Sequence, residues 1–355
     1  NFLYVMSNDG VYGYVQRKFL GESEYKTSES EYKEVEGKFF ELGEKVRLGW
    51  HQVTREEDNA KLSALVSGAE GLNVISPTWY RVSDTDGNII SKLDDDYIEE
   101  AHKMGLSVWA LVDNFATGVP ISEVLASTEA RENLINNLVS EALQHGFDGI
   151  NVDFESIPQT SGEDFVEFIK ELSVETRKYG IILSVDNNVP YNYNSYYGVE
   201  EQGLYVDYII IMAYDEHWAG STEAGSVASI GFVNDAISLT LSKVEAKRAV
   251  IGIPFYTRVW REAEDGTLSS IVLTMAKTED YLKTIEAKKN WDEETGQYYV
   301  EYIQGGNCCK IWIEDIKSIE EKLRAVGSAG CEGIAAWRLG METDDVWPLV
   351  SYLIQ

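Results

Sequence analysis

The sequence predicts an α/β protein, a closed (β/α)8 TIM barrel with a small α+β insertion after its seventh strand and a short β segment at its N-terminus. Two observations predict this fold. The 355 residues fall within the size range of one barrel that carries insertions. From residue 46 onward, strand-like runs alternate with amphipathic helical runs, and there are eight of each type, enough to close a parallel barrel. A doubly wound open sheet is the weaker alternative, because no glycine fingerprint follows the first strand.

The predicted strands are short apolar runs bounded by polar or turn residues. In chain order they are Val46–Trp50, Leu72–Ser76, Ser107–Val112, Gly149–Phe154, Ile181–Val185, Tyr208–Met212, Ala249–Phe255 and Gly333–Trp337. Gly149, Ile150 and Val152 in the fourth of these runs fit a strand that is buried in a parallel sheet.

The predicted helices carry apolar residues at spacings of three and four, and several have acids early and bases late. The clearest are Asp94–Lys103, Thr128–Gln144, Gly162–Tyr179, Phe232–Lys243, Glu314–Val326 and Asp344–Leu353. Weaker helical patterns at residues 57–67 and 196–204 complete the alternation.

Two regions fall outside the alternation. Residues 261–310 contain a helix-like run, Thr278–Lys289, and a strand-like run, Gln297–Ile303, so they predict a small α+β insertion. Residues 2–20 alternate apolar and polar side chains around Asn8-Asp9-Gly10, which is a hairpin signal. Because a hairpin alone is too small to be stable, we expect residues 1–20 to end a small β domain, 21–45 to be an acidic linker and 46–355 to form the barrel.

The net charge of −30 argues against nucleic acids and anionic membrane surfaces as partners, since both require a basic footprint. No apolar run is long enough to span a bilayer. The sequence begins at Asn1 without a signal-peptide pattern, so we expect a mature or trimmed chain. Cys308, Cys309 and Cys331 are too few for a disulfide framework, so we expect unligated thiols, and no Cys or His spacing predicts a metal site.

Asn151, Asp153 and Glu155 alternate along the fourth predicted strand, so in a strand their side chains point the same way. Barrel enzymes hold their catalytic groups at the C-terminal ends of such strands. A buried acid beside a second carboxylate can keep its proton near neutral pH and donate it to a leaving group. For this motif taken alone, a capped turn beside a core strand remains an alternative.

The ends of the other predicted strands are also rich in polar and aromatic residues. They are Trp50-His51-Gln52, Trp79-Tyr80, Asp113-Asn114, Asp186-Asn187-Asn188, Tyr214-Asp215-Glu216, Tyr256 with Arg258, and Trp337-Arg338. Any one of them fits a loop or a rim anchor, but seven such ends together indicate an enzyme.

Several of these segments resemble family 18 glycoside hydrolases, the chitinase-like enzymes. Residues 147–155 are similar to the Asp-x-x-Asp-x-Asp-x-Glu signature of that family, 212–215 to its strand-six motif, 252–260 to its strand-seven motif and 333–337 to its strand-eight tryptophan. The predicted insertion falls where many members carry a small α+β domain. The resemblance covers roughly residues 46–355.

One position departs from the chitinase pattern, because the middle acid is Asn151. Residues 74–79 and 151–155 resemble the branch that contains spore-cortex and cell-wall N-acetylglucosaminidases, which implies peptidoglycan as the substrate. Residues 10–15 resemble the last strands of a bacterial SH3-like domain, a common wall-binding attachment.

The resemblance implies a role for each candidate. Glu155 would protonate the glycosidic oxygen while the sugar's own 2-acetamido oxygen attacks the anomeric carbon, so that configuration is retained. Asp153 would accept the acetamide N–H, and Tyr214 would donate to the acetamide oxygen. Asn151 would hydrogen-bond Asp153 without sharing charge, which would leave Asp153 more easily ionised than one of two stacked aspartates. The implied sugar contacts are Trp337, Asp215, Tyr256, Arg258, Trp79 and Asn151.

Three functions remain open at this point. They are a retaining N-acetylglucosaminidase acting on peptidoglycan, a chitinase or chito-oligosaccharide hydrolase, and a non-catalytic sugar-binding barrel. The presence of Glu155 argues against the last. The sequence does not distinguish peptidoglycan from chitin, or endo from exo cleavage. No cofactor is implied, and we expect a monomer.

Overall fold

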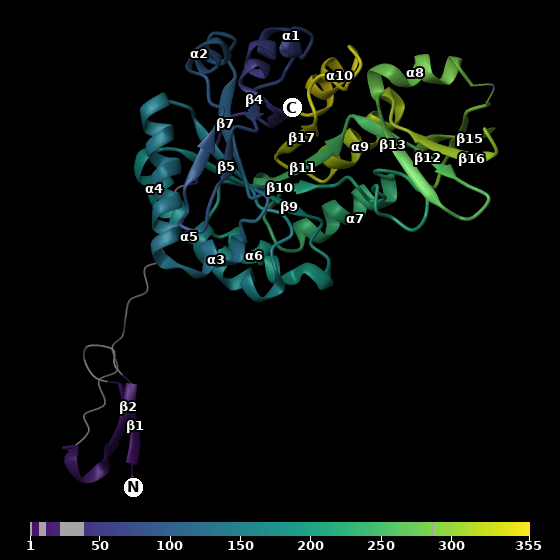
Figure 1. Cartoon of the computed structure of the whole chain (residues 1–355). Helices are drawn as coiled ribbons and strands as arrows, with labels where there is room; N and C mark the ends of the chain where they lie inside the picture. The colour runs from purple at the N-terminus through teal and green to yellow at the C-terminus, as the bar shows by residue number, and fades with distance from the viewer. Residues whose placement is uncertain (1, 7–11, 22–38, 286) are drawn as a thin grey trace. The chain divides into compact units, whose positions relative to one another are not determined.

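The computed structural model describes residues 2–6, 12–21, 39–285 and 287–355. The chain divides into two compact units, Asn1–Gly37 and Lys38–Gln355. Figure 1 shows the elements of both units.

The first unit contains an antiparallel hairpin. Strand β1 (Phe2–Met6) pairs with β2 (Tyr12–Gln16), and the short helix η1 (Arg17–Phe19) follows. The pairing confirms the predicted hairpin. Its predicted turn, Asn8-Asp9-Gly10, and most of the predicted linker lie outside the described residues.

Eight parallel strands form the closed barrel predicted from the alternation. They are β3 (Val46–His51), β4 (Val74–Pro77), β7 (Ser107–Asp113), β8 (Gly149–Asp153), β9 (Ile182–Asn188), β10 (Tyr208–Met212), β11 (Ala249–Pro254) and β17 (Gly333–Trp337). Each pairs in parallel with the next, and β17 pairs with β3, so this ring has no free edge.

The second barrel strand is interrupted after β4. The chain resumes as β5 (Tyr80–Val82), which also pairs with β7, and returns as β6 (Ile89–Ser91) antiparallel to β5. This local hairpin is absent from the predicted elements. It carries residues 80–82 beyond the barrel ring, above the C-terminal end of β4.

Helices cover the outside of the barrel (Figure 1). They are η2 (Glu56–Lys61) with α1 (Leu62–Val66), α2 (Asp95–Lys103), α3 (Ile121–Ala126), α4 (Thr128–His145), η3 (Gln159–Ser161) with α5 (Gly162–Tyr179), η4 (Asn192–Tyr197) with α6 (Val199–Gln202), α7 (Ile230–Leu241), η5 (Ala246–Arg248), α9 (Ile316–Ser328) and α10 (Val346–Leu353). Side-chain caps fix several starts; the Asp94 carboxylate, for example, accepts the Tyr97 backbone N–H at the start of α2. Of the α-helices in this list, α3 is the one not predicted.

The barrel interior is closed by large side chains below the level of the strand ends. Trp109 and Tyr208 stack there with ring centroids 5.2 Å apart. Gly149 makes room for them, because a Cβ at this position would lie 2.8 Å from Trp109 Cδ1. A filled interior leaves the C-terminal mouth as the place for a site.

The chain joins the barrel earlier than predicted. Two guanidinium groups contact the Phe39 ring, that of Arg248 at 3.8 Å and that of Arg177 at 5.0 Å from the ring centroid. The Phe40 backbone N–H donates to the buried carboxylate of Asp207 at 2.8 Å. Residues 39–45 therefore belong to the barrel unit, and the predicted linker, 21–45, extends too far. The sequence pattern could not show this, because the contacts join residues far apart in the sequence.

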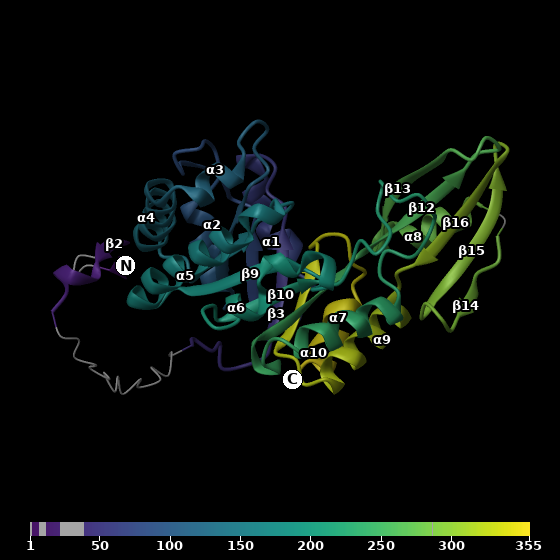
Figure 2. The same cartoon turned by 90° about the horizontal axis from the view of Figure 1, so that it is seen from below.

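The insertion is a five-stranded antiparallel sheet with one helix, beside the barrel (Figure 2). Its elements are β12 (Tyr256–Glu262), β13 (Leu268–Thr274), α8 (Met275–Lys283), β14 (Asn290–Asp292), β15 (Gln297–Gln304) and β16 (Asn307–Ile313). It starts directly after β11 and extends to residue 313, so the predicted bounds of 261–310 are too narrow. The predicted Thr278–Lys289 helix begins and ends earlier, as α8.

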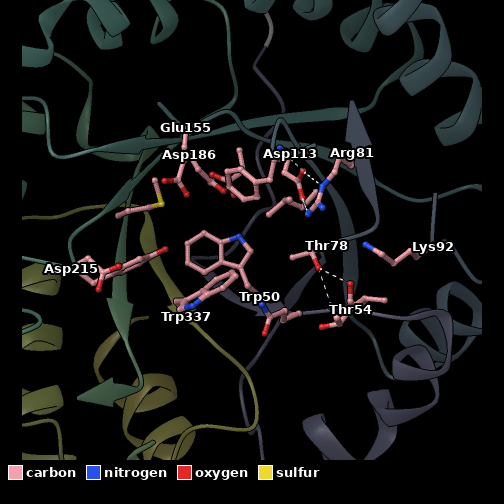
Figure 3. A pocket seen from close by; sticks show the side chains of 17 residues that line it. Trp50, Thr54, Thr78, Arg81, Lys92, Asp113, Glu155, Asp186, Asp215 and Trp337 are labelled. Atoms are coloured by element: carbon pink, nitrogen blue, oxygen red, sulfur yellow. Dashed lines mark hydrogen bonds and ion pairs between the residues drawn. The ribbon is translucent and has the colours of Figure 1, made fainter. Parts of the chain in front are cut away.

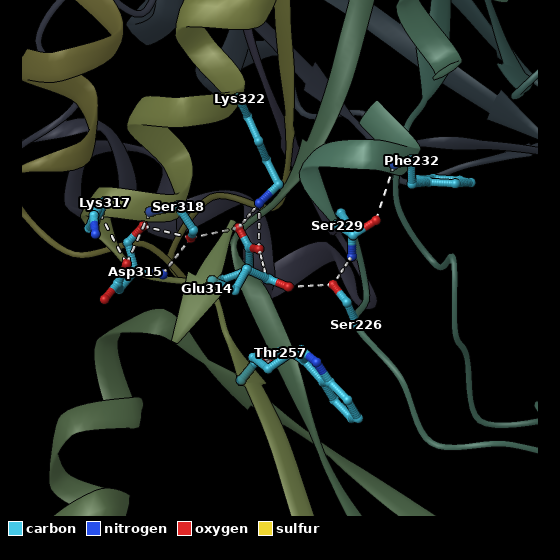
Figure 4. Close-up of polar contacts among 12 residues, drawn as sticks. Ser226, Ser229, Phe232, Thr257, Glu314, Asp315, Lys317, Ser318 and Lys322 are labelled. Atoms are coloured by element: carbon cyan, nitrogen blue, oxygen red, sulfur yellow. Dashed lines mark hydrogen bonds and ion pairs between the residues drawn. The ribbon is translucent and has the colours of Figure 1, made fainter. Parts of the chain in front are cut away.

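A buried polar cluster fastens the insertion to the barrel unit (Figure 4). The Lys322 ammonium of α9 contacts both Glu314 carboxylate oxygens, at 2.7 and 3.1 Å, and both side chains are fully buried. The Gln297 amide of β15 also donates to Glu314 and accepts from the Ser226 hydroxyl in the loop after β10. In this cluster the buried donors of Lys322, Gln297 and Ser226 each bond an acceptor, as buried polar groups usually do.

None of the helices in the part of the chain that the structure describes is long and apolar enough to cross a membrane.

Candidate active site

A pocket of about 360 Å³ opens at the C-terminal ends of the barrel strands (Figure 3). Its walls come from nearly every side of the barrel, which is where this fold places its active sites. The lining includes Trp50, Gln52, Thr54, Thr78, Arg81, Lys92, Asp113, Phe115, Asp153, Glu155, Asp186, Met212, Tyr214, Asp215 and Trp337.

Glu155 projects into the pocket just beyond the end of β8. The Asn114 side chain holds its backbone, donating to the Glu155 carbonyl at 2.8 Å and accepting its N–H at 3.0 Å. The next residue, Ser156, has a φ of 53°. Asp215, which follows Tyr214, is the other non-glycine residue with positive φ among those described. Such backbone strain concentrates at functional sites.

Three aspartates lie at one level of three adjacent strands. Asp113 of β7 pairs in register with Asp153 of β8, and Val152 pairs with Val185, which places Asp186 of β9 beside Asp153. All three side chains are buried. Side chains at matching positions of neighbouring strands are close enough for their charges to interact strongly.

Asp113 differs from the other two because it has a cation. Arg81 binds it with two hydrogen bonds, Nε to Oδ1 at 2.6 Å and Nη2 to Oδ2 at 2.9 Å. Asp153 and Asp186 have no ion-pair partner among the described residues. Burial and then the negative charge of Asp186 raise the pKa of Asp153 well above its usual value. Burial also raises the pKa of Asp186.

Asn151 does not make the predicted hydrogen bond with Asp153. Its Nδ2 donates to Asp186 Oδ1 at 2.8 Å, and its Oδ1 accepts from Trp50 Nε1 and Ser76 Oγ, each at 3.0 Å. It is fully buried, so the expectation of a sugar contact at Asn151 is wrong. We expected Asp153 to ionise more easily than one of two stacked aspartates. A second carboxylate is nevertheless present, because Asp186 on the next strand lies beside Asp153, and burial and then this charge raise the pKa of Asp153.

Burial, followed by the charges of Asp215 and Asp113, raises the pKa of Glu155. The side chain is half-buried and lines the pocket. Glu155 makes no ion pair with any residue in the described ranges. A carboxyl group in these surroundings keeps its proton to higher pH and has access to a ligand, which are the properties of a general acid.

Tyr214 and Trp337 both line the pocket, as the sequence predicts. Tyr214 packs over Gly252, where a Cβ would lie 3.2 Å from the ring, and its pKa is raised well above the usual value by burial, so the hydroxyl remains a donor. Trp337 packs edge-on against Trp50 with centroids 5.9 Å apart. Trp50, which the sequence analysis names at the end of its strand but not among the implied sugar contacts, also lines the pocket.

Asp215 lines the pocket, but two of its predicted companions lie behind it. The Tyr256 hydroxyl donates to Asp215 Oδ1 at 2.7 Å, and Arg258 Nη2 lies 4.0 Å from the same oxygen. Tyr256 is buried and Arg258 also bonds Ser270, so neither lines the pocket. Both orient Asp215 and do not offer a direct sugar contact.

Trp79 is outside the pocket. Its side chain is fully buried, its Nε1 donates to Asn59 Oδ1 at 2.8 Å, and its ring packs edge-on against Tyr97 of α2. The predicted sugar contact at Trp79 is wrong, because the break between β4 and β5 turns this side chain toward the helices.

No group of three or more His, Cys, Asp or Glu side chains that could hold a metal ion occurs among the residues that the structure describes.

Comparison with known proteins agrees with this geometry. Residues 80–342 match the family described as Glycosyl hydrolases family 18. YdhD of Bacillus subtilis, a predicted sporulation-specific glycosylase, is 28% identical over 266 residues, which are 71% of this chain and 62% of that protein. The cortical fragment-lytic enzyme of Bacillus subtilis is 23% identical over 249 residues, 68% of this chain and 58% of that protein. This chain thus spans about three fifths of either relative.

A chitinase from Chromobacterium violaceum has a similar solved structure, with a TM-score of 0.76 and 25% identity over 88% of this chain and 99% of the chitinase. The match to the family covers most of the barrel, from β5 to beyond β17, and it includes Asp153, Glu155, Tyr214 and Trp337. This chain belongs to glycosyl hydrolases family 18.

Proposed function

We propose that this chain is a retaining N-acetylglucosaminidase that cleaves β-1,4 bonds next to N-acetylglucosamine in peptidoglycan. One observation carries the proposal. Glu155 is a half-buried acid with a raised pKa, and beside it Asp153 is a buried acid whose Oδ1 has no hydrogen-bond partner among the described residues. A donor for the leaving oxygen and a buried acceptor for an amide N–H therefore lie next to each other.

In the first step Glu155 donates its proton to the glycosidic oxygen while the acetamide oxygen of the substrate attacks the anomeric carbon. The bond to the leaving sugar breaks, and an oxazolinium ion forms. Water then attacks the same carbon from the face that the leaving sugar vacated, with Glu155 as base. Two inversions at one carbon retain its configuration.

The remaining groups stabilise this intermediate. Asp153 accepts the acetamide N–H, and Tyr214 donates its hydroxyl to the acetamide oxygen. The proton kept by the Asp153 and Asp186 pair resides on Asp186 as positive charge develops, which leaves Asp153 anionic beside that charge. Trp337 forms the apolar floor, and Asp215, held by Tyr256, contacts a sugar hydroxyl.

Peptidoglycan is favoured by the names of two relatives, a sporulation-specific glycosylase and a cortical fragment-lytic enzyme. A peptidoglycan substrate implies that the protein acts outside the cell or at the cell wall. Chitin is the second candidate, favoured by the likeness of the whole barrel unit to the Chromobacterium violaceum chitinase.

The test is turnover of two oligosaccharide sets, peptidoglycan glycan strands and chitin oligomers, with products identified by mass. We expect products that end in N-acetylglucosamine, released faster from the peptidoglycan strands. Faster release from chitin oligomers would favour the second candidate. If the folded protein cleaves neither set, the proposed function is wrong.

A further inference from the structure

The two sides of the pocket differ in charge (Figure 3). The carboxylates of Glu155, Asp186 and Asp215 lie on one side of the two pocket tryptophans, and the cationic groups of Arg81 and Lys92 lie on the other. A chain with sixty acidic and thirty basic residues repels anionic polymers overall. Two cations at one side of its pocket therefore need a local reason.

Lys92 supplies the net positive charge at this side. It is half-buried, lines the pocket, and makes no ion pair with any residue that the structure describes. Its backbone is fixed, because its N–H donates to the Trp79 carbonyl at 3.0 Å and its carbonyl accepts from Asn59 Nδ2 at 2.8 Å. Burial, and then the nearby charge of Arg81, lowers the pKa of Lys92. An anion bound here would relieve this cost.

Arg81 contributes a fixed hydrogen-bond donor and little net charge. Its Nε and Nη2 are occupied by the buried carboxylate of Asp113, so the pair is neutral and the guanidinium is held in one orientation. Its Nη1 makes no hydrogen bond within the described residues. Arg81 and Lys92 thus offer N–H donors to the same side of the cavity, and such donors bind carboxylates strongly.

We propose that Arg81 and Lys92 bind a carboxylate on the glycan, and that the enzyme selects strands in which a charged muramyl residue flanks the N-acetylglucosamine. This inference rests on the proposed function, since it assigns a substrate feature to the same pocket. Muramyl residues alternate with N-acetylglucosamine in peptidoglycan and carry a 3-O-lactyl group. Its carboxylate is free in a bare strand, or is joined to a stem peptide that brings carboxylates of its own. Chitin has neither.

The experiment uses the whole chain and four tetrasaccharides of equal length. One has free lactyl carboxylates, one has the same groups capped as neutral amides, one carries short stem peptides, and one is chitotetraose. Wild-type kcat/KM should be about tenfold or more higher for a charged strand than for the amide-capped strand. The free-lactyl and peptide strands identify which carboxylate is bound.

Lys92→Gln should lower kcat/KM for the preferred charged strand by about tenfold, and at least several times more than for the amide-capped strand. Lys92→Arg should restore most of the preference. Lys103→Gln, on the outer face of α2 with an exposed ammonium, is the control and should change neither value.

Equal kcat/KM of wild type for charged and amide-capped strands would overturn the subsite and leave the proposed function intact. So would equal losses on both strands in folded Lys92→Gln. If wild type cleaves none of the four, the proposed function fails. Calorimetric binding of the charged and amide-capped strands to wild type and to Lys92→Gln then decides the subsite by itself, equal affinities being the contrary result.

Discussion

Two groups of carboxylates in the barrel unit have opposite surroundings, one at the insertion interface and one at the barrel mouth. At the insertion interface, Glu314 is bound by the Lys322 ammonium and by the Gln297 amide (Figure 4). At the barrel mouth, Asp153 and Glu155 have no cation partner among the described residues.

Burial raises the pKa of the carboxyl groups in both places, and the neighbouring charges oppose or add to that rise. Burial raises the pKa of Glu314 to about 7, and Lys322 opposes that rise. At the mouth the neighbours of Asp153 and Glu155 are other carboxylates, so desolvation and repulsion act together. A paired buried carboxylate fastens two parts of the fold. An unpaired cluster is costly to ionise and is therefore equipped for proton transfer.

The largest expected effect is at Glu155. Glu155→Gln keeps the shape but has no proton to donate, so kcat should fall by about 10²–10⁴. The raised pKa of Glu155 means that its stabilising contribution is complete below its unfolded pKa and is lost as the pH rises through its folded pKa. Above that pH, Glu155→Gln should therefore melt no lower than wild type. Turnover and Tm at alkaline pH check both statements.

Glu132→Gln on the exposed face of α4 is the matched control and should change neither quantity. More than about a tenth of wild-type turnover in Glu155→Gln would remove Glu155 from the role of general acid, whose loss costs on the order of a hundredfold or more.

The second effect is on stability, at the paired cluster. Lys322→Met leaves Glu314 buried without its cation, and we expect the free energy of unfolding to fall by about 3–5 kcal/mol. The double variant Glu314→Gln/Lys322→Met should recover most of that loss, because no buried charge then lacks a partner. Denaturant unfolding measures both. A double variant no more stable than Lys322→Met would show that the ion pair is not the reason.

The third effect concerns Asp207, a buried carboxylate at the opposite end of the barrel that also has partners. Its oxygens accept the backbone N–H groups of Phe40 and Leu183, each at 2.8 Å. Deleting residues 1–37 should leave Tm unchanged, whereas deleting 1–45 removes the Phe39 and Phe40 contacts and should cost about 3 kcal/mol. Equal Tm values for the two deletions would show that residues 39–45 do not stabilise the barrel and belong to the linker.

The smallest effect is expected at Asn151, whose neutral side-chain amide donates to Asp186. Asn151→Asp replaces this N–H donor by a carboxylate, which raises the pKa of the aspartate cluster further. The acidic limb of the kcat/KM profile should move to higher pH by about one unit. Asn136→Asp on the outer face of α4 is the control. If the acidic limb of the kcat/KM profile does not move in folded, active Asn151→Asp, the charge at position 151 does not affect the catalytic carboxylates.

The barrel and the first layer of the site follow from local sequence patterns. Alternation along residues 149–155 correctly predicts that Asp153 and Glu155 share a direction, and repeated strand and helix patterns predict eight parallel strands. These features depend on periods of two and 3.6 residues, which a sequence displays directly.

The features that the sequence prediction misses depend on contacts between distant segments. The partner of Asn151 is set by the register of β8 against β9, which brings Asp186 beside Asp153. The outward turn of Trp79 depends on the break between β4 and β5. The position of Phe39 depends on its contacts with arginines of α5 and η5. No spacing along the chain encodes such contacts.

The anomer released first by the enzyme tests the central claim most directly, because Glu155 and Asp153 are proposed to act with the acetamide of the substrate as nucleophile. Proton NMR in the first minutes of cleavage, before mutarotation equilibrates the new reducing end, separates the two anomers. Retention predicts that the β anomer of N-acetylglucosamine appears first and that the α anomer grows later. An α anomer that appears first would mean direct attack by water and would contradict substrate-assisted catalysis at this site.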